Sequence, residues 1–127
     1  MIAALLYLHE AASRKSNTKS LLTALCLKGL AKGRNASGEV IYIGRDPQLC
    51  QLVFPEDALN VARVHCMLHT DGKKIELRDM KSTGGTYLAD GTRLKPDDSV
   101  ELKNGSIFYI SNRDNLIAVV ANINNES

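Results

Sequence analysis

Three short segments carry the residues best suited to hold an anion. They are Gly44-Arg45 in "IGRDP", Arg63 and His65 in "VARVH", and the run 82–86 in "KSTGGTYL". Arginine forms bidentate charge-assisted bonds to phosphate, a hydroxyl can donate to a phosphate oxygen, and glycine lets main-chain N–H groups come close. These residue types together indicate a site for a tetrahedral anion.

The three segments lie between short, strand-like runs. From residue 23 onward, apolar runs are separated by turn-forming residues about every 8 to 12 positions. In "KIELR", Ile75 and Leu77 share one face of a strand and the charged residues share the other. The runs are 23–30, 39–44, 50–54, 64–70, 73–79, 86–89, 98–103, 106–112 and 115–121. Many short strands at even spacing predict a β-sandwich or a barrel.

Two of the separators favour tight hairpins. Asp71-Gly72 in "TDGKK" and Asn104-Gly105 in "KNGSI" tolerate the positive φ that a type I′ turn requires. Both are therefore predicted to join neighbouring strands directly.

The composition argues against several classes of function. The net charge of +2 is too small to indicate nucleic acid as a partner, and the basic residues between Arg14 and Arg34 fit a solvated face or linker. Cys26, Cys50 and Cys66 form no CxxC pair, so a reducing compartment, the cytoplasm, is expected rather than a disulfide framework. No cofactor is implied by the sequence.

Metal binding and catalysis are not expected either. His65 and His69 would lie about 13 Å apart on one face of a strand, too far to share an ion. Strand alternation sends His65 and Cys66 to opposite faces, and Ser82 has no evident base. We therefore expect no metal site, no catalytic residue and no enzymatic activity.

Residues 1–20 form a separate appendage. Its apolar run, residues 2–8, is too short to span a bilayer. Residues 2–12 could form an amphipathic helix that packs on the domain or on a second copy as a homodimer. Two alternatives stay open. The segment could be the remnant of a longer membrane helix, which would tether a cytosolic domain, or a frayed end.

The order and spacing of the three segments resemble the forkhead-associated (FHA) domain. The signature of this family runs GR, SRxH and SxNGT, and here it reads "GR", "ARVH" and "STGGT", with "ADG" following. The resemblance covers residues 23–121. It implies a β-sandwich of about eleven strands, assigned to residues 21–122 with a polar tail at 123–127. It also implies a non-catalytic adaptor that binds a phosphothreonine-containing protein in signalling.

The resemblance implies roles for the matching residues. Arg45 would grip the phosphate, Arg63 would supply a second cation, and Thr83 would donate its hydroxyl to a phosphate oxygen. Gly84 occupies the position that faces the peptide backbone. The residues expected to shape and brace the loops are Gly44, His65, Ser82, Gly85 and Thr86.

Two departures from the signature predict a weakened or altered site. The serine of SRxH, a direct phosphate ligand, is Ala62 here, and the asparagine of SxNGT is Gly84. A phosphate-independent scaffold or dimerisation module is therefore the alternative function.

Each site residue also has a structural alternative. Arg45 could pair with Asp46 or Asp79, and Arg63 could pair with Glu56 or Asp57. Thr83 could merely cap a turn.

Overall fold

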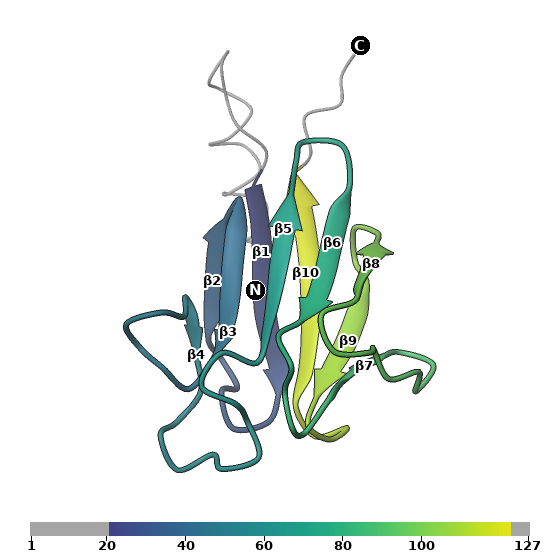
Figure 1. Ribbon diagram of the computed structural model, residues 1–127. Coiled ribbons are helices and arrows are strands. Elements are labelled where there is room, and N and C mark those ends of the chain that lie inside the picture. Colours follow the sequence, from purple (N-terminus) through teal and green to yellow (C-terminus); the bar gives the residue numbers. More distant parts are fainter. Residues whose placement is uncertain (1–20, 123–127) are drawn as a thin grey trace.

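Two five-stranded sheets lie face to face in the computed structural model (Figure 1). The structure describes residues 21–122, so the predicted N-terminal helix and the polar tail lie outside the described residues. The described part contains ten strands and no helix. The strands are β1 (Leu21–Lys28), β2 (Asn35–Gly38), β3 (Val40–Gly44), β4 (Leu52–Val53), β5 (Cys66–Thr70), β6 (Ile75–Asp79), β7 (Thr86–Leu88), β8 (Ser99–Leu102), β9 (Ile107–Ile110) and β10 (Leu116–Asn122).

The strand order confirms the predicted all-β sandwich. One sheet has the order β2-β1-β10-β9-β7 and the other β4-β3-β5-β6-β8. Every pair is antiparallel except β3 with the two-residue strand β4. The core lies between the sheets, where the period-two pattern places Leu68, Ile75 and Leu77 out of contact with solvent.

Strand β2 is the one strand of the described residues that the apolar pattern did not predict. Its sequence, "NASG", consists of turn-forming and small residues. It is a strand because it pairs with β1, where the Thr23 and Ser37 hydroxyls also lie 3.0 Å apart across the pair. Tertiary pairing here overrides the local propensity.

Of the two predicted hairpins, the one at Asp71-Gly72 is confirmed, although its turn is not type I′, and the one at Asn104-Gly105 is wrong. Strands β5 and β6 do form a hairpin, but their last pair is Thr70 with Ile75, so the connection has four residues rather than two. Only Gly72 has a positive φ there, and the Asp71 carboxylate instead accepts the N–H groups of Lys73 and Lys74. The Asn104-Gly105 turn joins strands of different sheets, because β8 pairs with β6 and β9 pairs with β10.

Candidate functional site

The three segments predicted to hold an anion come together at one end of the sandwich, at the bottom of Figure 1. They belong to the loops between β3 and β4 (45–51), β4 and β5 (54–65), and β6 and β7 (80–85). The β9–β10 turn (111–115) lies at the same end. Because alternate connections of antiparallel strands return to one end, residues far apart in sequence are brought close together.

Gly44 lets the first two loops approach each other. It is buried, and a Cβ atom at this position would collide with the carbonyl oxygen of Arg63. The backbone N–H of Arg45 donates to the carbonyl of Ala62 at 3.1 Å, and that of Asp46 to the carbonyl of Arg63 at 3.0 Å. The glycine therefore sets the spacing between the two arginine-bearing loops.

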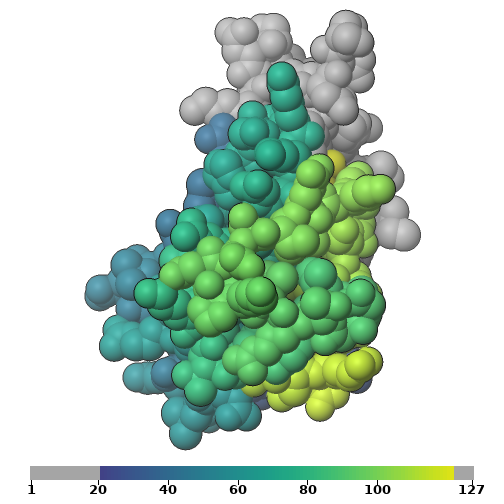
Figure 2. Space-filling view, turned by 45° about the vertical axis from the view of Figure 1, so that its right-hand side comes forward, coloured from purple at the N-terminus to yellow at the C-terminus, as the bar shows by residue number. Residues whose placement is uncertain are grey.

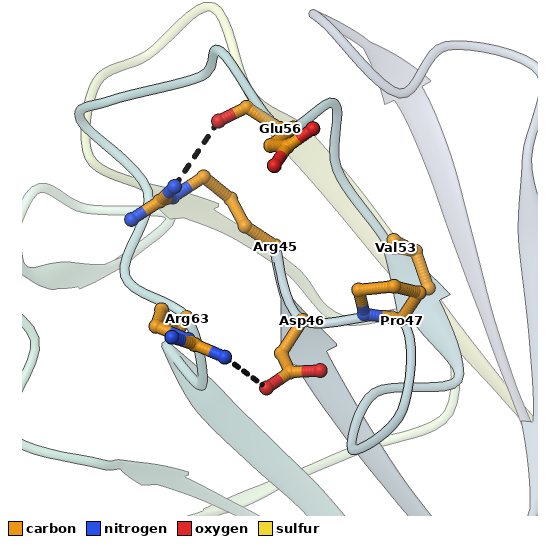
Figure 3. A pocket seen from close by; sticks show the side chains of 6 residues that line it. All are labelled: Arg45, Asp46, Pro47, Val53, Glu56 and Arg63. Carbon is orange, nitrogen blue, oxygen red and sulfur yellow. Dashed lines mark hydrogen bonds and ion pairs between the residues drawn. The ribbon is translucent and has the colours of Figure 1, made fainter.

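The Arg45 guanidinium reaches across to the β4–β5 loop. Its Nε donates to the Val61 carbonyl at 2.5 Å. Its Nη1 donates to the Glu56 carbonyl at 3.1 Å, as Figure 3 shows. The sequence offered Asp46 or Asp79 as an alternative partner for Arg45. Among the described residues its side chain instead bonds carbonyl oxygens. These bonds leave other N–H groups of the half-buried guanidinium for a ligand.

Arg63 forms an ion pair with Asp46. Its Nη2 lies 2.8 Å from Asp46 Oδ2, so the partner is neither Glu56 nor Asp57, the carboxylates expected from the sequence. The Arg63 side chain is 75% exposed, whereas that of Asp46 is 9% exposed. The hydrogen bond from Arg63 holds the pKa of Asp46 below its ordinary value, and the same contact raises the pKa of Arg63. Asp46 thus anchors an otherwise exposed cation.

The two arginines line one pocket with a volume of about 330 Å³ (Figure 3). Its floor and rim come from the first two loops and from β4. The lining residues are Arg45, Asp46, Pro47, Val53, Glu56 and Arg63. The structure therefore brings Arg45 and Arg63 together, as the anion-site hypothesis requires, and adds two carboxylate residues that the hypothesis did not include.

His65 connects the second and third loops from within the protein. It is fully buried, its Nδ1 accepts the N–H of Ala62 at 3.1 Å, and its Nε2 lies 2.8 Å from the Gly85 carbonyl. Because Nδ1 accepts, the proton of the neutral ring lies on Nε2 and donates to Gly85. Burial lowers the pKa of His65, which keeps the ring in this neutral form.

Asp79 organises the third loop and was missed by the sequence reasoning. Its buried carboxylate accepts the Ser82 hydroxyl at 2.5 Å, the Thr86 hydroxyl at 2.8 Å and the Ser82 N–H at 3.2 Å. Ser82 Oγ in turn accepts the N–H of Gly85 at 3.1 Å. The sequence did contain a signal for this role. Asp79 ends a strand three positions before Ser82, a spacing typical of side chains that bond the backbone of a turn.

Thr83 and Gly84 form the tip of the third loop, where Thr83 is exposed and Gly84 is half-buried. The Thr83 side chain is exposed and does not line the arginine pocket, and the carbonyl of Thr83 accepts a bond from Arg93 Nη2 at 3.1 Å. A Cβ atom on Gly84 would lie 2.6 Å from the Asn60 carbonyl oxygen and 3.0 Å from Ser111 Oγ. Gly84 therefore lets the tip pack against two neighbouring loops.

Two further properties of residues 21–122 bear on function. No helix among them is long and apolar enough to cross a membrane. Nor does any group of three or more histidine, cysteine, aspartate or glutamate side chains in this range lie where it could hold a metal ion.

A sequence model of the FHA domain matches residues 41–111, more than half of the chain, with all three loops inside the match. The protein therefore belongs to the FHA-domain family. A comparison with curated proteins found no match.

Solved structures with the same fold are FHA domains at low sequence identity. The FHA domain of CT664 from Chlamydia trachomatis superposes with a TM-score of 0.65 at 16% identity, covering 79% of this chain and 96% of that one. An FHA domain of an Arabidopsis thaliana protein gives 0.64 at 20% identity, with coverages of 86% and 90%. The MEK1 FHA domain, bound to a HOP1 phosphothreonine peptide, gives 0.62 at 22% identity, with coverages of 82% and 97%. These similarities establish the fold.

Proposed function

We propose that this protein is a non-catalytic adaptor that binds a phosphothreonine segment of a partner protein, with reduced affinity. Arg45 and Arg63 contact the phosphate, and the Thr83 hydroxyl bonds one of its oxygens from the neighbouring loop. The observation that carries the proposal is that two arginines from separate loops line one pocket at the loop end of an FHA sandwich.

The chemistry of the pocket fits a phosphate dianion. Two guanidinium groups supply charge-assisted bonds, each worth about 1.5–3 kcal/mol in general. The Arg45 side chain is already held by two carbonyl oxygens, so little rotational freedom is lost when an anion binds. The MEK1 FHA domain provides a precedent on the same fold, since its solved complex contains a phosphothreonine peptide.

Three features support the reduced affinity. Ala62 offers no hydroxyl where the family signature has serine, and Gly84 offers no amide where it has asparagine. A neutral hydrogen bond is worth on the order of 1 kcal/mol, so two missing bonds lower affinity by roughly ten- to a hundredfold. In addition, the Asp46 carboxylate already engages Arg63 and competes with the phosphate for it.

The burial of Ser82 and of the three cysteines supports a non-catalytic role. Ser82 does contact a carboxylate, that of Asp79, although no base for it was evident from the sequence. Both residues are buried and bond the loop, so Ser82 cannot meet a substrate. Burial also raises the pKa of the Cys26, Cys50 and Cys66 thiols, which makes them poor nucleophiles at neutral pH.

The proposal is tested by titrating a degenerate phosphothreonine peptide pool and its unphosphorylated twin into wild type and two single variants, Arg45→Ala and Arg63→Ala. Arg78→Ala, which removes an exposed arginine from strand β6, is the matched control. We expect binding to require the phosphate, to fall at least tenfold in either site variant and to be unchanged in the control. Equal binding of the two pools would refute the proposal.

A second function, phosphate-independent protein binding, is favoured by two exposed leucines at the same end of the sandwich. Leu49 and Leu59 are 55% and 80% exposed, in the first and second loops. On this alternative, Leu59→Ser weakens the binding of phosphorylated and unphosphorylated partners by the same factor. A homodimer formed through residues 2–12 remains a further proposal on a segment outside the described residues.

The cytoplasm is the compartment we propose for this protein. All three cysteines are free and buried, as expected in a reducing environment.

A further inference from the structure

The outer face of the β2-β1-β10-β9-β7 sheet is largely apolar. Alternate residues of its strands, such as Leu22, Ala24 and Val119, lie in the core, so the residues between them point away from it. Among the described residues of these strands, the one charged side chain on the outer face is Lys28, which lies beyond a bulge at the loop end and pairs with Asp114. The other outward residues are Thr23, Leu25, Asn35, Ser37, Tyr87, Ile107, Tyr109, Leu116, Ala118 and Val120.

Four of these residues form a continuous apolar patch across three strands. Leu25 of β1 lies opposite Ala118 of β10, and Ala118 lies opposite Ile107 of β9. Val120 is the next outward residue of β10. We call Leu25, Ile107, Ala118 and Val120 the apolar patch. Leu25 is 5% exposed although it faces away from the core, which is the burial expected beneath a covering segment.

The outer face of the other sheet has the polarity that is usual for a solvated surface. His69, Glu76 and Glu101 lie side by side in one row across β5, β6 and β8, and Arg78 lies in a neighbouring row. An antiparallel sheet with one face in water normally has polar residues on that face. The contrast between the two outer faces indicates that the apolar patch is a contact surface.

The rest of the apolar sheet is already covered by described residues. Near the loop end, the guanidinium groups of Arg93 and Arg113 each lie 5.8 Å from the centre of a ring, those of Tyr87 and Tyr109 respectively. The β7 edge is paired with the segment 92–94. Figure 2 shows this edge, where residues of β7 and the loop after it, in green, lie above the yellow β9–β10 turn. What is left is the apolar patch, toward the end of the sheet where β1 begins.

We propose that residues 2–12 of the same chain form a helix that packs on the apolar patch. These residues directly precede β1 and lie outside the described residues. Ile2, Leu5 and Leu6 recur at helical spacing, and the run 2–8 carries no charge, which matches the uncharged patch. A helix this short is marginal in water and needs a surface to pack on.

The length of the chain fits this placement. Leu21 pairs with Asn122 at the end of the sheet nearest the patch, and Leu25 lies about 13 Å farther along β1. The eight residues 13–20 can span up to about 26 Å. A helix of residues 2–12 would be about 16 Å long and about 10 Å wide, enough to cover β1 and β10 over the patch.

The proposal makes the N-terminal segment part of the folded domain. It thereby selects among the roles that the sequence left open for residues 1–20, namely packing on the domain, a second copy, a membrane remnant and a frayed end. It is independent of the phosphate site, so either proposal can fail while the other holds.

The test uses a nitroxide spin label on the full chain and NMR spectra of its backbone amides. The label is attached at Ala4→Cys, on the side of the helix away from Leu5 and Leu6. The native cysteines are buried, and wild type treated with the same reagent controls for them. We expect amides of the apolar patch to lose most of their intensity, and those of Met67 and Glu76 on the other outer face to keep most of theirs.

Two multiple variants separate packing from mere proximity. Adding Leu5→Ser and Leu6→Ser to the labelled protein removes the apolar side of the helix and should restore the patch signals. Adding Leu49→Ser and Leu59→Ser instead, at two exposed leucines of the loops, is the matched control and should leave the broadening unchanged.

The remaining outcomes overturn the proposal. A patch that is not broadened, or that stays broadened in the Leu5→Ser and Leu6→Ser variant, shows that the segment does not pack there through its apolar side. A mixture of isotope-enriched protein without the label and labelled protein without enrichment tests for a second copy. Patch broadening in this mixture would mean that the segment packs on a neighbouring molecule instead of on its own sheet.

Discussion

Replacing Asp79 by Asn tests whether one buried carboxylate holds the third loop in place. The carboxylate accepts two hydroxyl groups and one backbone N–H. In Asp79→Asn the two hydroxyl bonds become neutral, and an amide NH₂ faces the N–H of Ser82. A hydrogen bond to a charged group is worth about 1.5–3 kcal/mol and a neutral one about 1 kcal/mol, so the loss over the site is about 3 kcal/mol.

Urea unfolding and thermal melts would measure this loss. For a domain of this size, about 1 kcal/mol corresponds to roughly 4–8 °C in Tm, so Asp79→Asn should melt about 15 °C lower than wild type. Asp79→Ala should lower the free energy of unfolding by about 1 kcal/mol more than Asp79→Asn does. The alanine also leaves the buried hydroxyls of Ser82 and Thr86 without their acceptor. Asp98→Asn, at an exposed position, is the control and should be neutral.

The same variant links stability to function. Phosphopeptide affinity should fall in Asp79→Asn even at temperatures where the protein stays folded, because Thr83 lies on the loop that the carboxylate organises. The reasoning is refuted if the free energy of unfolding of Asp79→Asn lies within about 0.5 kcal/mol of the wild-type value, the range typical of surface substitutions.

Three further predictions concern the binding end of the sandwich. Ala62→Ser should tighten phosphothreonine binding about fivefold in calorimetric titrations, and no gain would contradict the assigned role of this position. Gly84→Asn should instead lower the free energy of unfolding by about 1–3 kcal/mol without tightening binding, because its Cβ would lie 2.6 Å from the Asn60 carbonyl oxygen. The pKa of His65 is lowered in the folded protein, so the unfolded chain binds more protons below its own pKa of about 6.5. The free energy of unfolding should therefore fall from pH 7.5 to pH 5.5 in the wild-type protein, and it should fall less in His65→Gln. If urea unfolding showed the same loss in both proteins, it would count against a buried neutral histidine.

The sandwich was predictable because its strands alternate in polarity. Leu68, Ile75 and Leu77 are apolar at every second position of their strands, and each is buried in the core. Strand β2 could not be predicted in the same way, since only its pairing with β1 makes "NASG" extended. The turn at Asn104-Gly105 shows a related limit, because turn residues do not reveal which sheet the next strand joins.

The sequence predicted that Arg45 and Arg63 lie near each other, as they do in one pocket, but it did not predict their partners. Arg63 was expected to pair with a carboxylate close to it in sequence, yet it pairs with Asp46. That contact depends on the close approach of two loops at Gly44, which is a tertiary feature. Likewise, the binding of Arg45 to backbone carbonyls depends on how the second loop folds back toward β3.

The most direct test of the central claim is to map the backbone amide shifts of the labelled protein in NMR spectra. A short phosphothreonine peptide chosen from the pool is added, and then its unphosphorylated twin. We predict that the phosphorylated peptide shifts the amides of residues 45–46, 62–65 and 82–85, and that the twin leaves these signals in place. Shifts confined to other faces of the sandwich, or equal shifts with both peptides, would contradict a phosphate site at Arg45 and Arg63.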